Sequence, residues 1–207
     1  MTKIGNTVKI YKRSKRNGKY RLFKKFWQND KVRIRPIRLE DWKERYLNLF
    51  DSEAEWLLDE EIKLPSDEKI AEEQFKRWCE EGFDKNGKIR LTIETLDGIN
   101  VGGYNLNTID ERNGTFGIGI RINIENRGKG YGTSAMIILL DYAFNERRLN
   151  KYQTIIAEGN IASGKMLEKL GCTKEGIIRG TTFHKGKYWD AIHYGLFAEE
   201  FNKIYKK

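Results

Sequence analysis

The stretch Glu125–Thr133, ENRGKGYGT, places three glycines within five residues, with basic side chains beside them. Before it, TFGIGIRINI (115–124) carries an apolar residue at every second position, which predicts a strand with one buried face. After it, SAMIILLDYAF (134–144) is nearly all apolar and has the length of a buried helix. The glycine loop therefore joins a strand to a helix, a place where the unpaired amides of a first helical turn bind anions such as phosphate.

Two common phosphate-binding motifs do not fit the loop. A Walker P-loop requires GxxxxGK[ST], which this sequence lacks. A dinucleotide fingerprint requires GxGxxG, and here the third glycine position is Thr133. A plain helix start would need only one glycine, so three favour close approach of a ligand to the backbone.

The elements around the loop predict one mixed α/β domain. Periodicity indicates a strand at 32–36, a helix from Glu40 to about Leu57, a helix at about 67–81, and strands at 88–95, 99–109 and 115–124. The buried helix follows the loop, and then come a strand at 152–158, a helix at 160–171, strands at 173–183 and 187–197, and a short C-terminal helix. We expect an α+β fold with a central twisted, mostly antiparallel sheet and helices on both faces.

The net charge of +9 is concentrated at the N-terminus. Residues 1–38 contain fourteen Lys or Arg and one acid, Asp30, whereas the rest of the chain is mildly acidic. Alternating apolar and basic residues around Asn17-Gly18 predict a basic β-hairpin over residues 7–27. We therefore divide the chain into an N-terminal extension, 1–30, and a main domain, 31–207.

The remaining composition excludes several classes of protein. No run of eighteen apolar residues is present, so we expect neither a membrane span nor ordinary secretion. Cys79 and Cys172 are isolated, and His184 and His193 are the only histidines. We therefore expect no metal site, no disulfide framework and a reducing cytoplasmic location.

Three motifs in order resemble the GNAT family of N-acetyltransferases. Arg127, Gly130 and Gly132 match the pattern [Q/R]xxGx[G/A]. NIASGKMLEKLGC (160–172) resembles the family's second signature. GKYWDAIHYGL (186–196) is similar to the closing strand of the branch that includes ribosomal-protein alanine and polyamine acetyltransferases. The resemblance covers about residues 32–200 and leaves the basic extension outside.

The resemblance implies acetyl-CoA as co-substrate, with its pyrophosphate on the amides of the glycine loop. It also implies that the pantetheine chain enters between the strand before the loop and strand 152–158, and bonds peptide groups near Ile122. It assigns Asn160 to the pantetheine arm or a neighbouring backbone group, although Asn160 would also serve as a helix N-cap. The implied cofactor-binding residues are Ile122, Arg127, Gly128, Lys129, Gly130, Tyr131, Gly132, Thr133, Asn160 and Ser163.

The catalytic groups are less complete. Many family members use a tyrosine as proton donor to the leaving thiolate, and Leu167 stands at that position. The ribosomal-protein branch uses a serine at the Ser163 position, so Ser163 is the candidate donor. The two carboxylates that relatives use as base correspond to Gly117 and Thr182. The base stays unassigned among Glu94, Glu158, Asp190 and a water chain.

Three functions remain open: a small-molecule amine acetyltransferase, a protein N-terminal acetyltransferase, and a non-catalytic binding module. The acidic stretch DSEAEWLLDEE (51–61) would draw in a cation such as a polyamine or an aminoglycoside antibiotic, or form a solvated helix face. The basic extension would instead dock a protein N-terminal acetyltransferase on RNA, or add a strand pair to a sheet or to a homodimer interface. A non-catalytic acyl-CoA-binding or nucleic-acid-binding module is the third. Trp42, Trp56, Trp78 and Trp189 would line an acceptor pocket or belong to the core.

Overall fold

A computed structural model of the protein describes residues 26–59, 62, 64–81 and 89–206. The predicted basic hairpin lies outside these residues except for Phe26 and Trp27. A seven-stranded sheet forms the centre of the described part, in the order β1-β2-β3-β4-β5-β7-β6. All neighbouring strands are antiparallel except β4 and β5, which are parallel. The expected mixed α/β fold with a mostly antiparallel sheet is confirmed.

The elements follow the predicted order along the chain. The strands are β1 (Val32–Pro36), β2 (Ile89–Thr95), β3 (Asn100–Asp110), β4 (Thr115–Ile122), β5 (Lys151–Ala157), β6 (Thr173–His184) and β7 (Lys187–Phe197). The α-helices are α1 (Trp42–Asn48), α2 (Ser52–Asp59), α3 (Glu68–Glu81), α4 (Tyr131–Asp141), α5 (Ile161–Leu170) and α6 (Ala198–Tyr205). Short 3-10 turns cover Leu39–Asp41 and Ile124–Asn126, and a π-helical turn, Tyr142–Glu146, extends α4.

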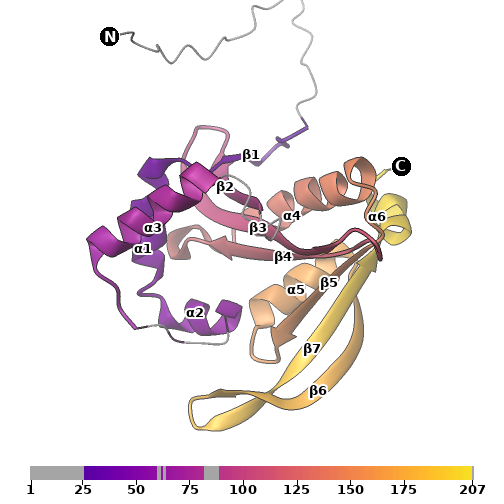
Figure 1. The fold of residues 1–207 in the computed structure, drawn as a ribbon. Coiled ribbons are helices and arrows are strands. Elements are labelled where there is room, and N and C mark those ends of the chain that lie inside the picture. Colours follow the sequence, from indigo (N-terminus) through magenta and orange to yellow (C-terminus); the bar gives the residue numbers. More distant parts are fainter. Residues whose placement is uncertain (1–25, 60–61, 63, 82–88, 207) are drawn as a thin grey trace, which may run out of the picture.

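Helices cover the sheet on both sides (Figure 1). The N-terminal helices α1, α2 and α3 gather at one side of the view, and α4, α5 and α6 at the other. The apolar face of β4 accounts for the packing of α4 on the sheet. Its alternate residues Phe116 and Ile118 are buried in the core with Leu139 and Leu140 of α4. α4 is apolar around its whole circumference because it packs against β1, β4 and α5.

One predicted helix is divided in two. The sequence predicts a single helix from Glu40 to about Leu57, but the structure ends α1 at Asn48 and starts α2 at Ser52. Asp51 explains the restart, because its carboxylate accepts a hydrogen bond from the amide of Ala54 at 3.2 Å, as an N-cap residue does. Helical periodicity alone does not reveal such a break.

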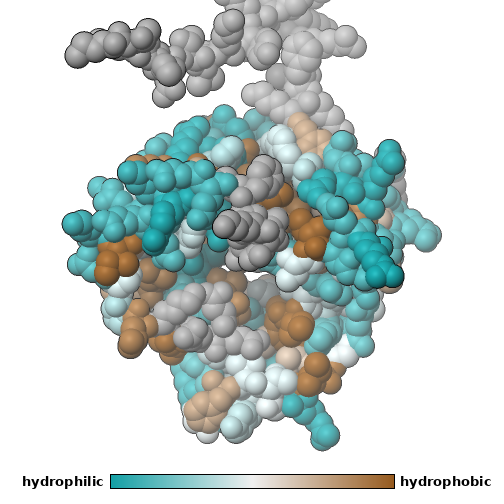
Figure 2. Space-filling model, in the orientation of Figure 1, coloured by the Kyte–Doolittle hydropathy of each residue, from teal (hydrophilic) through white to brown (hydrophobic). Residues whose placement is uncertain are grey.

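The surface is mostly hydrophilic in the view of Figure 2, with hydrophobic side chains in small separate groups. Within the described residues, no helix is both long and apolar enough to cross a membrane.

A buried polar network holds the first strands together. The Arg35 guanidinium donates two hydrogen bonds of 2.7 Å to the Asp41 carboxylate and a third, also 2.7 Å, to Glu94. Asp41 also accepts from the Arg38 amide, the Thr92 hydroxyl and the Asn100 side chain, at 2.9 to 3.0 Å. Each charge therefore has hydrogen-bonded partners, which a buried ion pair requires.

This network sets the protonation of Asp41. Burial by itself would raise the pKa of Asp41, but the hydrogen bonds from Arg35, the Arg38 amide and Thr92 outweigh it and lower that pKa. A lowered folded-state pKa contributes stability above the ordinary carboxyl pKa, and that stability is lost as the pH falls through the folded-state value.

We predict that Asp41→Asn lowers the free energy of unfolding by about 3–5 kcal/mol at pH 7, because it leaves Arg35 buried without its main partner. Urea unfolding measures this. The wild-type chain should lose stability as the pH falls below about 4, and the variant should show a flatter pH profile there. Glu199→Gln, at an exposed ion pair with Lys203, is the control. Equal stability of Asp41→Asn and wild type at pH 7 would show that the network is not stabilising.

Candidate active site

The sheet opens between β4 and β5. The two strands pair only at Thr115 with Lys151 and at Phe116 with Tyr152. No further β4–β5 pair follows in the described residues, although β4 stays paired with β3 as far as Ile122 and β5 stays paired with β7 as far as Ala157. The C-terminal parts of β4 and β5 therefore diverge and leave facing backbone edges that an extended ligand can use.

The glycine loop lies at the end of this opening. Gly132 is close to both sides: a Cβ there would lie 3.5 Å from Ile122 of β4 and 3.4 Å from Met166 of α5. Gly130, the N-cap of α4, has φ of 83° and ψ of 5°, a left-handed conformation that glycine adopts without strain. No side chain caps α4, and its first turn contains no acid. The amides of Tyr131, Gly132 and Thr133 thus have no intrahelical partner and carry the positive end of the helix dipole.

The Arg127 side chain does not extend over this helix end. Its Nε donates to the Ile122 carbonyl at 3.0 Å, and its Nη2 donates to Asp51 Oδ2 at 2.6 Å. Lys129 donates to Asn126 at 3.3 Å. The Arg127 guanidinium, which the family resemblance implies as cofactor-binding, is therefore directed to the protein itself.

Lys31 provides a cation that the sequence motifs do not identify. A Cβ on Gly130 would lie only 3.2 Å from Lys31 Nζ. The Asn29 side chain fixes this position: it donates to the Ser134 carbonyl of α4 at 2.9 Å and accepts from the amides of Lys31 and Val32 at 3.0 Å. Within the described residues, the Lys31 ammonium has no carboxylate partner. A search of local motifs misses Lys31 because Asn29 and Ser134 are 105 residues apart.

Asn160 caps α5 and also holds α2. Its Oδ1 accepts from the Ser163 amide at 3.1 Å, and its Nδ2 donates to the Leu57 carbonyl at 3.1 Å. Both polar ends of this buried side chain are therefore used within the protein. Ser163 lies half-buried in the first turn of α5. Leu167, at the position where many relatives have tyrosine, is buried in the core.

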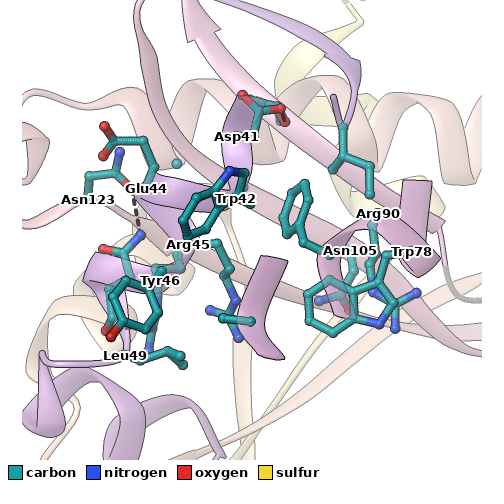
Figure 3. A pocket seen from close by; sticks show the side chains of 18 of the residues that line it. Asp41, Trp42, Glu44, Arg45, Tyr46, Leu49, Trp78, Arg90, Asn105 and Asn123 are labelled. Atoms are coloured by element: carbon teal, nitrogen blue, oxygen red, sulfur yellow. Dashed lines mark hydrogen bonds between the residues drawn. The ribbon is translucent and has the colours of Figure 1, made fainter. Parts of the chain in front are cut away.

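A cavity of about 790 Å³ lies on the face of the sheet opposite α4. Figure 3 shows Trp42, Tyr46 and Leu49 of the α1 region on one side, and Trp78 of α3 with Arg90 of β2 on the other. The Arg90 guanidinium stacks 4.7 Å from the centre of the Trp78 ring. Trp42 and Trp78 thus line a cavity, as one of the two sequence interpretations expected.

The floor of the cavity is polar and reaches the opening. It includes Asn105 and Asn107 of β3, and Gly119 and Arg121 of β4. Gly119 leaves room for Asn105, since a Cβ would lie 3.0 Å from its side-chain nitrogen. Gly119 and Arg121 belong to the part of β4 that has no partner on β5. The cavity and the opening therefore meet along β4.

Three acids of the stretch 51–61 that the structure describes are paired within the chain. Asp51 pairs with Arg127, Glu53 with Lys185, and Glu55 with Arg121. The Glu55 side chain is 2% exposed and that of Arg121 is 9% exposed, so this pair is buried. Glu60, Glu61 and the Asp59 side chain lie outside the described residues.

The other two candidate tryptophans, Trp56 and Trp189, belong to an aromatic cluster at α2. Trp56 stacks on His184 with ring centres 3.9 Å apart, and the Trp189 ring lies 5.8 Å from Trp56. Trp189 also donates to the His184 carbonyl at 3.2 Å. Both are packing residues, as the other sequence interpretation expected.

Two of the three candidate bases have structural roles. Glu94 pairs with Arg33 and Arg35, on a strand separated from β4 by β3. Asp190 accepts from the Gly180 amide at 2.9 Å. Glu158 is exposed, directly after β5. Among the residues that the structure describes, no group of three or more His, Cys, Asp or Glu could hold a metal.

Comparisons with known proteins agree with this geometry. A family model for the acetyltransferase (GNAT) domain matches residues 31–173. The SPbeta prophage-derived uncharacterized N-acetyltransferase YokL of Bacillus subtilis (strain 168) is 31% identical over 179 residues, which cover 85% of this chain and 95% of the relative. The putative ribosomal N-acetyltransferase YdaF of the same organism is 33% identical over 126 residues, or 59% of this chain and 66% of YdaF.

A solved structure shares the fold. It is the spermidine N-acetyltransferase from Vibrio cholerae in complex with CoA and spermine, with a TM-score of 0.72 at 20% identity. The alignment covers 84% of this chain and 99% of that one. At that identity the likeness concerns the fold alone.

We predict that Asn160→Ala lowers the free energy of unfolding by about 1–2 kcal/mol, because the cap of α5 is lost together with the bond to Leu57. Asn160→Ser retains a capping oxygen but lacks the amide that reaches Leu57, so its loss should be smaller. Urea unfolding of both variants separates the two contributions. If serine costs as much as alanine, the cap contributes nothing measurable.

Proposed function

This chain belongs to the GNAT family of N-acetyltransferases, and we propose that it transfers the acetyl group of acetyl-CoA to a primary amine of a small molecule. Polyamines and aminoglycoside-like antibiotics are the acceptor classes in view. The observation that carries the proposal is the opening between β4 and β5, with the α4 N-terminus at its end and the cavity on its other side.

We propose that acetyl-CoA lies in this opening with its pyrophosphate end at the N-terminus of α4. We assign the pyrophosphate to the α4 amides of Tyr131, Gly132 and Thr133, with Lys31 as the added cation. The pantetheine chain would follow the unpaired edge of β4 from Ile122 toward the sheet centre. The left-handed Gly130 supports this assignment, because any side chain there would lie between Lys31 and the first turn of α4.

The reaction is a direct transfer. The lone pair of a neutral amine attacks the thioester carbon, and the C–S bond breaks as CoA leaves. Backbone amides of β4 would hold the developing oxyanion. Ser163, in the first turn of α5, is our proposed proton donor to the thiolate. Because Glu94 and Asp190 are engaged elsewhere, we leave removal of the amine proton to Glu158, directly after β5, or to water in the cavity.

The cavity favours a small acceptor. Its volume of about 790 Å³ lies within the range of small-molecule pockets, and aromatic walls over a polar floor are their usual lining. Its contact with β4 would bring an amine to the thioester from the face opposite α4.

The basic N-terminal extension supports a second candidate. The ten Lys or Arg of residues 1–30 would bind RNA phosphates in a salt-dependent way. An N-terminal acetyltransferase that acts on a ribosomal protein would use such a segment for docking, and the acceptor would then be a peptide N-terminus.

The test is thiol release from acetyl-CoA with a panel of polyamines, aminoglycosides and peptides that carry ribosomal-protein N-termini. We expect turnover with at least one small amine. Turnover with peptides alone would select the second candidate, and no turnover with any amine would contradict both.

Calorimetric titration with CoA tests the cofactor loop. Gly130→Ala should raise the dissociation constant of CoA at least roughly tenfold, because its Cβ crowds Lys31 at the helix end. Gly98→Ala is a matched control: Gly98 also has a left-handed φ, of 89°, but lies in the β2–β3 turn with open space around its Cβ. Unchanged affinity in Gly130→Ala would contradict the loop assignment.

A further inference from the structure

The segment between α1 and α2 touches both halves of the site. Leu49 and Phe50 line the cavity, and the next residue, Asp51, reaches Arg127 of the glycine loop. The break between the two helices is what brings Asp51 to this place. A short segment therefore joins the acceptor side of the sheet to the cofactor side.

Arg127 connects three parts through its planar fork. Its Nε bonds the Ile122 carbonyl at the end of β4, and its Nη2 bonds Asp51. Arg127 is also the first residue of the glycine-loop motif, so its backbone belongs to the loop. Two donors of one rigid group thus fix the distance between loop, strand end and helix segment, which a lysine cannot do.

The Asp51 carboxylate is held in its charged form. Burial would raise its pKa, but the bonds from Arg127 and the Ala54 amide outweigh this and lower the pKa of Asp51. Its side chain is 16% exposed, compared with 41% for Arg127, so the pair is partly shielded from solvent.

A second link runs parallel to the first. Arg121, two strand positions before Asn123, bonds the Asn48 carbonyl at 3.0 Å and pairs with Glu55. Asn48 also donates to Asn123 at 3.0 Å, the bond drawn as a dashed line in Figure 3. The α1–α2 segment is therefore attached to the whole end of β4, and a shift of the loop would be transmitted to the cavity wall.

We propose that Arg127 and Asp51 form a positioning pair that couples the cofactor loop to the acceptor cavity, and that Arg127 is not a phosphate ligand. This inference rests on the proposed function, since it assumes that CoA occupies the loop. The pair holds the loop in its binding conformation, so both partners are needed for CoA affinity. This holds for Asp51 even though its charge has the same sign as that of the phosphates.

The test is calorimetric titration with CoA of the full chain, wild type and variants. We expect Asp51→Asn and Arg127→Gln each to raise the dissociation constant roughly fivefold, and the double variant to stay near fivefold, because both break one pair. Arg127→Lys should resemble Arg127→Gln. If Arg127 were a phosphate ligand, Asp51→Asn would leave affinity unchanged or improve it, and Arg127→Lys would bind nearly normally; either result overturns the proposal.

Two further variants complete the design. Lys31→Gln should weaken CoA binding and add its effect to that of Asp51→Asn, because Lys31 belongs to neither partner of the pair. Glu111→Gln breaks a surface pair with Arg147 of 2.7 Å at the other end of β4, and should leave CoA affinity unchanged. Thermal unfolding of each variant in the absence of CoA should remain near wild type, which separates positioning from general loss of fold.

The outcomes distinguish this inference from the proposed function. If the wild-type chain does not bind CoA, both are overturned. If it binds CoA and Asp51→Asn binds as well as wild type, only the positioning pair is overturned. With an amine that is acetylated, Asp51→Asn should also raise the acceptor KM, although Asp51 does not line the cavity.

Discussion

The incomplete pairing of β4 with β5 is the constraint on which the site depends. The two parallel strands share only two residue pairs and then diverge. Each stays paired on its other side, β4 with β3 and β5 with β7. The glycine loop continues from the end of β4, so α4 begins beside the opening. The polar floor of the cavity lies on the other face of the same strand. In the proposed function, the donor and acceptor sites therefore share one strand.

Several charges around the described site serve the protein's own architecture. The acidic stretch 51–61 suggests a site for a cationic substrate, yet Asp51, Glu53 and Glu55 pair with Arg127, Lys185 and Arg121. The arginine of the glycine motif likewise turns to a carbonyl and a carboxylate. Lys31 places its ammonium beside the helix end, and Asn29 holds the backbone amide of Lys31. Counting charges along a sequence therefore overestimates how many are offered to ligands.

The sequence predicted most of the fold because its signals are local. Alternation in 115–124, the glycine loop and the apolar helix after it all appear in the structure, and β7 has the predicted bounds. The division between α1 and α2 was missed because helical periodicity continues across Asp51, the residue that caps α2. The contact of Asp51 with Arg127, 76 residues away, was missed because it is not local. The roles of Lys31 and Asn29 were missed for the same reason, because only the folded chain brings them to α4. The sequence predicted only one of the two roles of Asn160. Its N-cap bond is local, whereas its bond to the Leu57 carbonyl is not.

The central claim is that CoA lies along the opening with its phosphates on the first turn of α4. Hydrogen exchange of backbone amides, measured with and without CoA, tests it most directly. We predict that CoA slows exchange in two segments, residues 118–122 of β4 and residues 131–133 of α4, while β1 and β2 stay unchanged. CoA binding without slower exchange in these two segments would contradict it.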